Sequence, residues 1–383
     1  MTRSASPPAL GHLYVDTALS EAVADGRITA PDAGGVDRAQ VQPASLDLRL
    51  GREAVRIRAG FLPGAVGIEQ RLAELEVSRL PLEGAGAVLE RGLVYLVPLE
   101  ERLALEPGVR ALFNPRSSTG RCDVFARVLV PGHPRFNETP PGYRGPLWLE
   151  VSPLSFPVRL ARGDRLAQLR LERGAAALSE AELRQEYART PLLHDERGPI
   201  DAAAVPFDGE GGIALHLGLA GREPAGWRAQ AHTGVVHFAR EGAHAVRDFW
   251  EPVHAAGGTH ILAPGAFYLF ASRERVVVPP HLAAEMEPVA VDLGEMRNNY
   301  AGFFDNGFGW RSEAPHGTPA VLEVRAHDVP FLVEEGQVFF RLRWFRTGGT
   351  PARLYGEGRE RSSYRDQDLT PARCFRATDE ANR

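Results

Sequence analysis

An internal repeat is the feature that most constrains the fold of this chain. The segment LERGLVYLVPLEERLAL (89–105) matches LAPGAFYLFASRERVVV (262–278), an offset of 173 residues. The same offset relates six further pairs: Pro115 with Pro288, Pro146 with Pro319, Glu150 with Glu323, Pro157 with Pro330, Gly163 with Gly336 and Arg170 with Arg343. At a slightly different offset, SLDLRLG (45–51) resembles GIALHLG (212–218). Since 383 residues suffice for two domains of roughly 150–200 residues, we predict two copies of one domain.

The join between the copies falls in a polar stretch that contains glycine and proline. This stretch is HDERGPIDAAAVPFDGEGG, residues 194–212. Such composition is typical of a connection and not of a core element. We therefore place the first domain at residues 1–198 and the second at residues 205–383.

Each copy has the pattern of a β domain. Short alternating runs such as LDLRL, VYLVPL, LWLEV, FPVRLA and LAQLRL are separated by Gly, Pro or Asp about every eight to twelve residues, which indicates a sandwich or barrel. Helix is sparse. One candidate runs from an Asp16/Thr17 cap to Gly26, and another begins with the capping box Ser179-x-x-Glu182.

Composition excludes several classes of function. All 44 basic residues are arginine, so a Schiff-base lysine and a Walker phosphate loop are both impossible. A net charge of −5 argues against broad binding of nucleic acid. The sequence has no signal core and no apolar run near the ~20 residues of a membrane helix. Two cysteines, Cys122 and Cys374, are too few for a disulfide framework or a four-cysteine zinc cluster, which fits a reducing cytoplasm.

The run RSSTGR (116–121) is the first candidate for a binding site. Two guanidinium groups can hold phosphate oxygens bidentately, hydroxyls add donors, and glycine lets the backbone approach an anion. The alternative is an ordinary surface turn. However, the matched positions in the second copy are the apolar Val289, Ala290 and Val291. A turn required by the fold would keep its polar residues in both copies, so the polarity indicates a function.

The second candidate is the carboxylate of Glu150 in PGYRGPLWLEV (141–151). Strand alternation places Glu150 on the same face as Trp148 and Ser152. Partial desolvation beside a tryptophan would raise the pKa of Glu150, which suits a general base. The alternatives are a glutamate that faces solvent or pairs with an arginine, and a structural role shared with Glu323 in VLEV.

The C-terminal stretch 353–375 is polar and rich in arginine. It is either a frayed tail or a lid in which Arg361, Tyr364 and Gln367 close over an anionic ligand. The histidines are scattered and show no metal-ligand spacing.

Several of these motifs together resemble one enzyme family. ASLDLRLG, RSS-x-x-R, the PGYRG hairpin before a glutamate-bearing strand, and G-x-x-L-A-Q (163–168) are similar to motifs of dCTP deaminases. ALSEAVADGRI (18–28) is similar to their N-terminal helix and turn. The family shares its superfamily with trimeric dUTPases. The resemblance implies two distorted, jelly-roll-like β-barrels with a few short helices, as in the long, duplicated branch of the family.

The resemblance also implies roles for the two candidates. Arg116, Ser117 and Ser118 match the family's phosphate-binding motif, and Arg121 matches the arginine beside its active site. Glu150 matches the catalytic glutamate that activates water for attack on C4 of cytosine, with Ser117 and Arg121 holding the glutamate and the water.

Further substrate contacts are implied in the same way. Tyr143 falls where the family has an aromatic residue near the deoxyribose, and Gln168 matches the glutamine of the following strand. Tyr364 and Gln367 resemble the phosphate lid. The hairpin lacks the family's aspartate, whereas FFDNGFGW (303–310) carries Asp305 at 18 positions before Glu323. An active site assembled from both copies therefore stays open.

The expected activity is hydrolytic deamination of dCTP to dUTP and ammonia, with Mg²⁺ accompanying the triphosphate. Zinc deaminases require a P-C-x-x-C segment, which this chain lacks, so a carboxylate must activate the water. The alternatives are a dUTPase, a bifunctional enzyme that continues to dUMP, and a non-catalytic nucleotide-binding protein. The resemblance implies a homo-oligomer, with a trimer as one possibility.

Overall fold

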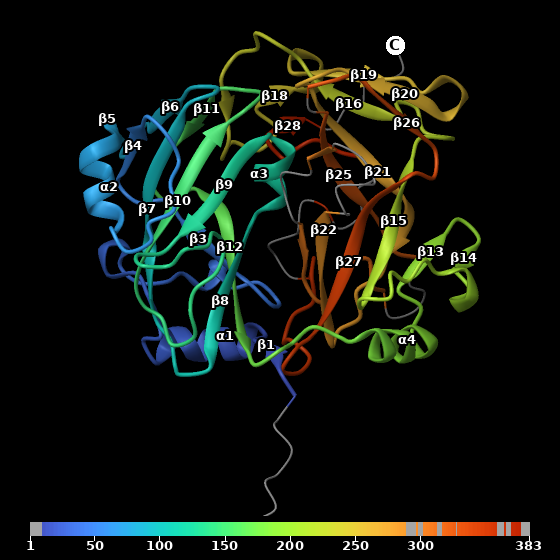
Figure 1. Cartoon of the computed structure of the whole chain (residues 1–383), viewed down its shortest axis with the longest axis horizontal. Coiled ribbons are helices and arrows are strands. Elements are labelled where there is room, and N and C mark those ends of the chain that lie inside the picture. The colour runs from blue at the N-terminus through green and yellow to red at the C-terminus, as the bar shows by residue number, and fades with distance from the viewer. Residues whose placement is uncertain are drawn as a thin grey trace, which may run out of the picture.

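The computed structural model shows two β-rich halves side by side (Figure 1). It describes residues 10–288, 296–297, 302–311, 316–326, 328–357, 364 and 369–376. We call residues 10–175 the first half and residues 179–376 the second half. Strands dominate both halves and helices are short, which confirms the mainly β class predicted from the sequence.

The first half is built from curled antiparallel sheets. One sheet has the order β5-β4-β7-β10-β9, with β2 also paired to β7, and a second has the order β1-β12-β3, with β8 also paired to β12. A small third sheet joins β6 and β11 to β17 of the second half. The bounds are β1 (His12–Leu13), β2 (Ile28–Thr29), β3 (Leu46–Arg49), β4 (Glu53–Ile57), β5 (Glu76–Pro81), β6 (Ala87–Leu89), β7 (Val94–Ala104), β8 (Val109–Pro115), β9 (Val124–Leu129), β10 (Arg144–Pro153), β11 (Val158–Leu160), β12 (Arg165–Arg173) and β17 (Val236–His237).

The second half has one large sheet and two small ones. The main path of the large sheet has the strand order β14-β13-β21-β15-β27-β22-β24. Strands β16, β19, β23 and β25 pair beside this path. Its strands are β13 (Leu193–Asp195), β14 (Gly198–Pro199), β15 (Gly212–Gly218), β16 (Gly226–Ala229), β19 (Trp250–Val253), β21 (Phe267–Val276), β22 (Leu282–Pro288), β23 (Met296–Arg297), β24 (Phe303–Phe304), β25 (Thr318–Ala326) and β27 (Val338–Arg346). The small sheets pair β18 (His244–Ala245) with β28 (Phe375–Arg376), and β20 (Thr259–Leu262) with β26 (Phe331–Glu334).

The helices are short and lie at the periphery or at the boundary between the halves. They are α1 (Asp16–Ala24), α2 (Ile68–Leu75), α3 (Ser117–Arg121) and α4 (Glu180–Arg189), together with single 3₁₀ turns at Pro31–Ala33, Arg38–Gln40, Ala202–Ala204, Val246–Asp248 and Ala256–Gly258. Helix α4 begins with the predicted capping box between Ser179 and Glu182. Although α4 lies before residue 198, its Leu183 and Tyr187 pack into the core of the second half.

Strand register repeats between the halves at the offset found in the sequence. In the β10–β7 pair, Glu150 lies opposite Leu96 and Val151 opposite Tyr95. In the β25–β21 pair, Glu323 lies opposite Leu269 and Val324 opposite Tyr268. Every partner is therefore displaced by 173 residues, and Glu150 and Glu323 occupy equivalent positions in their sheets.

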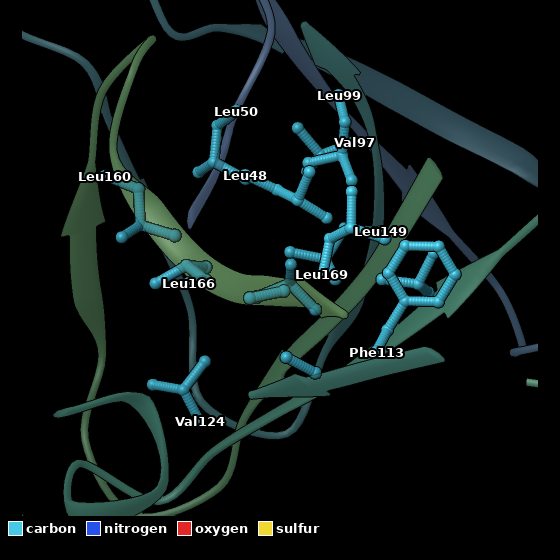
Figure 2. Close-up of a cluster of buried hydrophobic side chains, with 14 of the residues drawn as sticks. Leu48, Leu50, Val97, Leu99, Phe113, Val124, Leu149, Leu160, Leu166 and Leu169 are labelled. Carbon is cyan, nitrogen blue, oxygen red and sulfur yellow. The ribbon is translucent and has the colours of Figure 1, made fainter. Parts of the chain in front are cut away.

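Alternation along the strands produces the core of the first half. The close-up in Figure 2 shows leucine, valine and phenylalanine side chains of this core converging from several strands, among them Leu48, Val97, Leu149 and Leu169. Each is fully or almost fully buried, and burying such a side chain stabilises the fold by about 1.5–3 kcal/mol. Because Leu149 points into this core, Glu150 points to the opposite face of β10.

Buried polar contacts connect the two halves. Arg325 donates to Asp123, which also accepts from Ser155. Arg170, almost fully buried, forms an ion pair of 2.9 Å with Glu285. An arginine that is buried and paired across the boundary fixes how the halves are oriented, because separating them would leave a charge without its partner.

Candidate active site between the two halves

The RSSTGR run forms the short helix α3 at the end of β8. Arg116 precedes the helix in extended conformation, and its backbone N–H donates to the carbonyl of Leu166 at 2.9 Å. The hydroxyl of Thr119 donates to the same carbonyl at 2.8 Å. These two hydrogen bonds tie both ends of the motif to β12, so Ser117 and Ser118 are held on a rigid element.

Helix α3 borders a cavity of about 670 Å³ between the halves. The position of helix α3, between the two halves, can be followed in Figure 1. The first half contributes a mostly polar wall that includes Asp47, Arg116, Ser117, Ser118, Arg121, Arg165 and Gln168. The second half contributes a largely apolar wall with three acids and part of the C-terminal segment: Glu241, Met286, Gly302, Phe303, Phe304, Asp305, Phe308, Pro319, Val321, Glu323, Tyr355, Tyr364 and Arg373.

Three arginines surround one buried carboxylate in this cavity. Arg116 Nε lies 3.0 Å from Asp47 Oδ1, and Arg165 Nη1 lies 3.7 Å from Asp47 Oδ2. Burial raises the pKa of Asp47, while Arg116, Arg165 and Arg373 act in the opposite direction. Three guanidinium groups gathered at Asp47 suit a polyanionic ligand, and Arg373 also acts on the neighbouring Asp164 of the lining.

Glu323 lies on the other side of α3 and closes tightly against it. A Cβ placed on Gly120 would lie only 2.2 Å from Glu323 Oε2, so the glycine of RSSTGR permits the approach of this carboxylate. Burial raises the pKa of Glu323 to about 8; Arg121 lowers it and Asp123 adds to the rise. A carboxyl that is desolvated, beside an arginine and at a cavity wall has the properties of a general base near neutral pH.

Asp305 is a second buried acid of the same cavity. Its Oδ1 accepts a hydrogen bond from the backbone N–H of Ala44 at 2.8 Å, and the hydroxyl of Ser45 lies 3.3 Å from both of its oxygens. Burial raises the pKa of Asp305 to about 7. Ala44 and Ser45 belong to the ASLDLRLG motif, so this motif connects the first half to an acid of the second.

Residues of the C-terminal segment lie directly on α3. The Tyr364 hydroxyl is 2.7 Å from Ser118 Oγ, and the Arg121 guanidinium lies 3.8 Å from the centre of the Tyr364 ring. Arg121 also donates to the carbonyl of Thr370 at 2.6 Å. Tyr364, expected as a lid residue, is therefore placed at the cavity, whereas Arg361 and Gln367 lie outside the described residues.

Two residues expected at the site lie elsewhere. Glu150 is buried on the face of β10 that also carries Trp148, and it forms an ion pair of 2.5 Å with Arg127. Tyr143 packs in the core of the first half, and its hydroxyl donates to the carbonyl of Pro146 at 2.7 Å. Neither lines the cavity that contains Arg116 and Arg121. The physical reason for Glu150 is what packs on its face of β10, because Gly60 and Arg127 of the first half contact its carboxylate and α3 does not.

Several site residues were not singled out from the sequence. Asp47, Arg165 and Arg373 carry no motif signal of their own, although Asp47 lies within ASLDLRLG. Glu323 was visible as the counterpart of Glu150, and Asp305 as the aspartate missing from the first hairpin. The sequence did not show that these second-half residues lie close to α3.

The structure also bears on metals and membranes. Within the described ranges, no cluster of three or more His, Cys, Asp or Glu side chains has a geometry that would hold a metal ion. None of the helices in the same ranges has the length and apolar character that a membrane crossing requires.

A cavity that joins an arginine-rich wall to a desolvated carboxyl defines an enzyme site for an anionic small molecule. Comparison with known proteins identifies the family. The model of the 2'-deoxycytidine 5'-triphosphate deaminase N-terminal domain matches residues 11–175, and that of the C-terminal domain matches residues 179–375. The chain therefore belongs to the 2'-deoxycytidine 5'-triphosphate deaminase family.

Individual relatives agree with this assignment. The chain is 42% identical to the protein in the crystal structure of 2'-deoxycytidine 5'-triphosphate deaminase from Agrobacterium tumefaciens, with a TM-score of 0.81 over 89% of this chain and 99% of that one. It is 31% identical to a dCTP deaminase of Halorubrum lacusprofundi over 40% of this chain and 73% of the relative. It is 35% identical to a dCTP deaminase of Natronomonas pharaonis over 34% of this chain and 65% of the relative's length.

Proposed function

We propose that this chain deaminates dCTP by hydrolysis, giving dUTP and ammonia. The observation that carries the proposal is Glu323, a buried carboxyl with its pKa raised to about 8, at the wall of a cavity shared with the arginine and serine motif of α3. Membership of the family and the names of its relatives support the substrate.

The two walls of the cavity suit the two ends of this substrate. Arg116, Arg165 and Arg373 provide positive charge for the triphosphate, which arrives with its Mg²⁺ as part of the substrate. Phe304 and Val321 belong to the apolar wall beside Glu323, which suits the flat face of cytosine. The base would then present C4 to the carboxylate.

Glu323 would act as base and then as acid. It takes a proton from water while the water oxygen bonds to C4 of cytosine. Glu323 passes this proton to N3 of the ring. It then takes the proton of the new C4 hydroxyl and delivers it to the exocyclic nitrogen, the C4–N bond breaks, and ammonia leaves as the C4 carbonyl forms. Arg121 lowers the pKa of Glu323 and so favours the ionised form that the first step requires.

The proposal moves the catalytic role from Glu150 to Glu323. Both carboxylates occupy the same register position, but only Glu323 lines the cavity with Arg116, Ser117 and Arg121. Glu150 is held by Arg127 on another face of the molecule. The roles predicted for Arg116, Ser117, Ser118, Arg121 and Gln168 are kept in the proposal, since all five line the cavity. The sugar contact predicted for Tyr143 stays a prediction.

The test is to incubate the full chain with dCTP and to measure ammonia and pyrophosphate separately. Release of ammonia with accumulation of dUTP supports the proposal. If the chain binds dCTP, as a thermal shift would show, but releases no ammonia, it is a nucleotide-binding protein and not a deaminase.

Asp305 favours a bifunctional enzyme as the second candidate. A second buried acid with its pKa raised to about 7 lies in the same cavity and could activate a second water. A relative from Methanobrevibacter smithii, 30% identical over 78% of its length, is named "dCTP deaminase, dUMP-forming". Pyrophosphate formed in step with ammonia, and lost selectively in Asp305→Asn, would support this candidate.

The expected homo-oligomer, with a trimer as one possibility, and the cytoplasmic location are also proposals. The cavity needs residues from both halves of one chain, so catalysis does not by itself demand a second copy. Light scattering of the purified chain measures the assembly directly.

A further inference from the structure

The two cysteines of the chain meet directly behind the candidate active site. Cys122 follows the last residue of α3, and Cys374 lies next to β28 in the C-terminal segment 369–376. Their sulfur atoms are 3.7 Å apart although the residues are separated by 252 positions. Both side chains are almost fully buried, so each sulfur has the other as a close neighbour in the core.

Tyr364 and the C-terminal segment 369–376 also contact groups that we assign to substrate binding. Tyr364 contacts the hydroxyl of Ser118 and covers the Arg121 guanidinium, and Arg121 donates to Thr370. The backbone N–H of Arg373 in turn donates to the Tyr364 hydroxyl at 3.1 Å. The cavity is present beside these contacts, and each contact that a nucleotide replaces makes a further donor of Ser118 or Arg121 available to the ligand.

We propose that Cys122 and Cys374 form a reversible disulfide that locks the C-terminal segment onto α3 and keeps its contacts with Ser118 and Arg121 in place, so that fewer donors of these two side chains reach a nucleotide. The effect on nucleotide rests on the proposed function, whereas formation of the bond does not. A disulfide requires sulfur atoms about 2.05 Å apart, so rotation of the two side chains must bring them closer from van der Waals contact. The bond would connect the residue after Arg121 to the residue after Arg373.

The oxidant is a small peroxide, and the reaction balances in two steps. One thiolate attacks a peroxide oxygen, the O–O bond breaks, and a sulfenic acid forms with release of water. The second thiol sulfur then attacks the sulfenic sulfur, the S–S bond forms, and a second water leaves. Two cysteines are oxidised by two electrons while one peroxide is reduced to two waters. An added dithiol reverses the reaction by exchange.

Burial makes this reaction depend on the position of the segment. Burial, and then the neighbouring Cys374, raise the pKa of the Cys122 thiol well above its ordinary value, so little thiolate exists while the segment is docked. Displacement of the segment exposes the sulfurs to water and peroxide. Redocking then brings the thiol and the sulfenic acid together, so the segment is trapped in its docked position.

The experiment treats the reduced full chain with hydrogen peroxide and follows three quantities: free thiols after denaturation, the cross-linked peptide in a digest, and turnover of dCTP. We expect both thiols to disappear together, a peptide joining Cys122 to Cys374 within one chain, and a fall in turnover of at least about tenfold that dithiothreitol reverses. The matched control is Cys374→Ala, which cannot form the bond and should keep most of its turnover after the same exposure. If Cys374→Ala does not fold, Cys374→Ser serves in its place.

Different failures point to different parts of the inference. Thiols that persist at peroxide doses that oxidise a solvent-exposed cysteine peptide overturn the disulfide, as does a cross-link between two chains. A disulfide that forms while turnover is unchanged overturns the lock. A disulfide that forms in a protein whose reduced state never released ammonia leaves the bond established and overturns the proposed function instead.

Discussion

Glu150 and Glu323 hold the same position in the two halves but have opposite surroundings. Each is buried on a long strand, and each is approached by a glycine: Gly60 for Glu150 and Gly120 for Glu323. Gly60 belongs to the same half as Glu150, and Arg127 pairs with that carboxylate. Gly120 belongs to the other half, and Glu323 lines an open cavity. Burial is therefore common to the two carboxyls, and the groups that contact them differ.

The residues of the RSSTGR motif, unlike the two glutamates, are present in one half only. The first half has Arg116, Ser117 and Ser118, whereas the matched sequence of the second half is Val289, Ala290 and Val291, which lies outside the described residues. The first half thus supplies Arg116, Arg121 and Arg165 of the cavity, and the second half supplies Glu323. The comparison implies one complete site for each chain, located between the halves.

The largest expected effect distinguishes the two carboxylates directly. Glu323→Gln keeps the shape of the side chain but removes the base, so ammonia release from dCTP should fall by about 10²–10⁴-fold. Glu150→Gln is the matched control and should change the rate by less than about threefold. Both variants should still give a thermal shift with dCTP. A larger loss in Glu150→Gln than in Glu323→Gln would reverse the assignment.

The next effect tests the asymmetry of the anion-binding motif. Arg116→Met removes a guanidinium from the cavity, and charge-assisted hydrogen bonds of this kind correspond to a loss of about 10- to 100-fold in kcat/KM. The loss should appear mainly in KM for dCTP. Arg135→Met is the control, because this side chain is 74% exposed, and it should leave kcat/KM and KM for dCTP unchanged. Equal kinetics for the two variants would remove Arg116 from the site.

The raised pKa of Glu323 predicts a pH dependence with a definite sign. A base must be ionised, and a pKa of about 8 leaves most of Glu323 protonated near neutral pH. The kcat/KM for dCTP should therefore rise about tenfold between about pH 7 and about pH 9 and then level off. A profile that is flat over this range, measured with a stable wild-type enzyme, contradicts the role.

The same carboxyl should lower the stability of the fold as pH rises, whereas it raises the activity. Because the folded pKa of about 8 exceeds the ordinary 4.5, the folded state binds the proton more tightly than the unfolded state. The stability that this proton contributes is complete below about pH 4.5 and is lost as pH rises through about 8. Relative to Glu323→Gln, the wild type should thus lose free energy of unfolding with rising pH, as urea titrations at several pH values would show.

The smallest effect on activity is expected at the partner of Glu150. Arg127→Met leaves a buried carboxylate without its cation, which should lower the free energy of unfolding by on the order of 3 kcal/mol. Turnover at a temperature where the variant is folded should stay within about twofold of the wild type. The double variant Arg127→Met with Glu150→Gln should recover much of the free energy of unfolding, because position 150 then carries no buried charge without a partner. A turnover defect as large as that of Glu323→Gln would place Arg127 and Glu150 in a working site.

Much of the fold could be predicted from the chain because its signals are local. Alternation in LWLEV and VYLVPL predicts strands and their buried faces, and the offset of 173 predicts the register that the β10–β7 and β25–β21 pairs share. The capping box at Ser179 predicts the start of α4. The alternation and the capping box depend on residues within one strand or one turn, and the offset comes from comparing two segments of the chain with each other.

The candidate site could be predicted only in part. RSSTGR indicates an anion-binding element because its polarity has no counterpart in the second copy, and α3 does line the cavity. Glu150 was favoured as the base because it follows that motif more closely in sequence than Glu323 does. The structure places Glu150 against Gly60 and Arg127 of its own half and Glu323 against Gly120 of α3, and proximity in sequence does not report this difference.

The sequence by itself determined the β class, the repeated register and the kind of chemistry, because periodicity and residue type act through local geometry and through side-chain pKa. Tertiary structure alone decided which carboxyl meets the arginines. The contact of Gly120 with Glu323 and that of Ser45 with Asp305 each span more than 200 residues, and packing of one half against the other brings them together. No local pattern encodes that approach, because its distance is set by the whole interface between the halves.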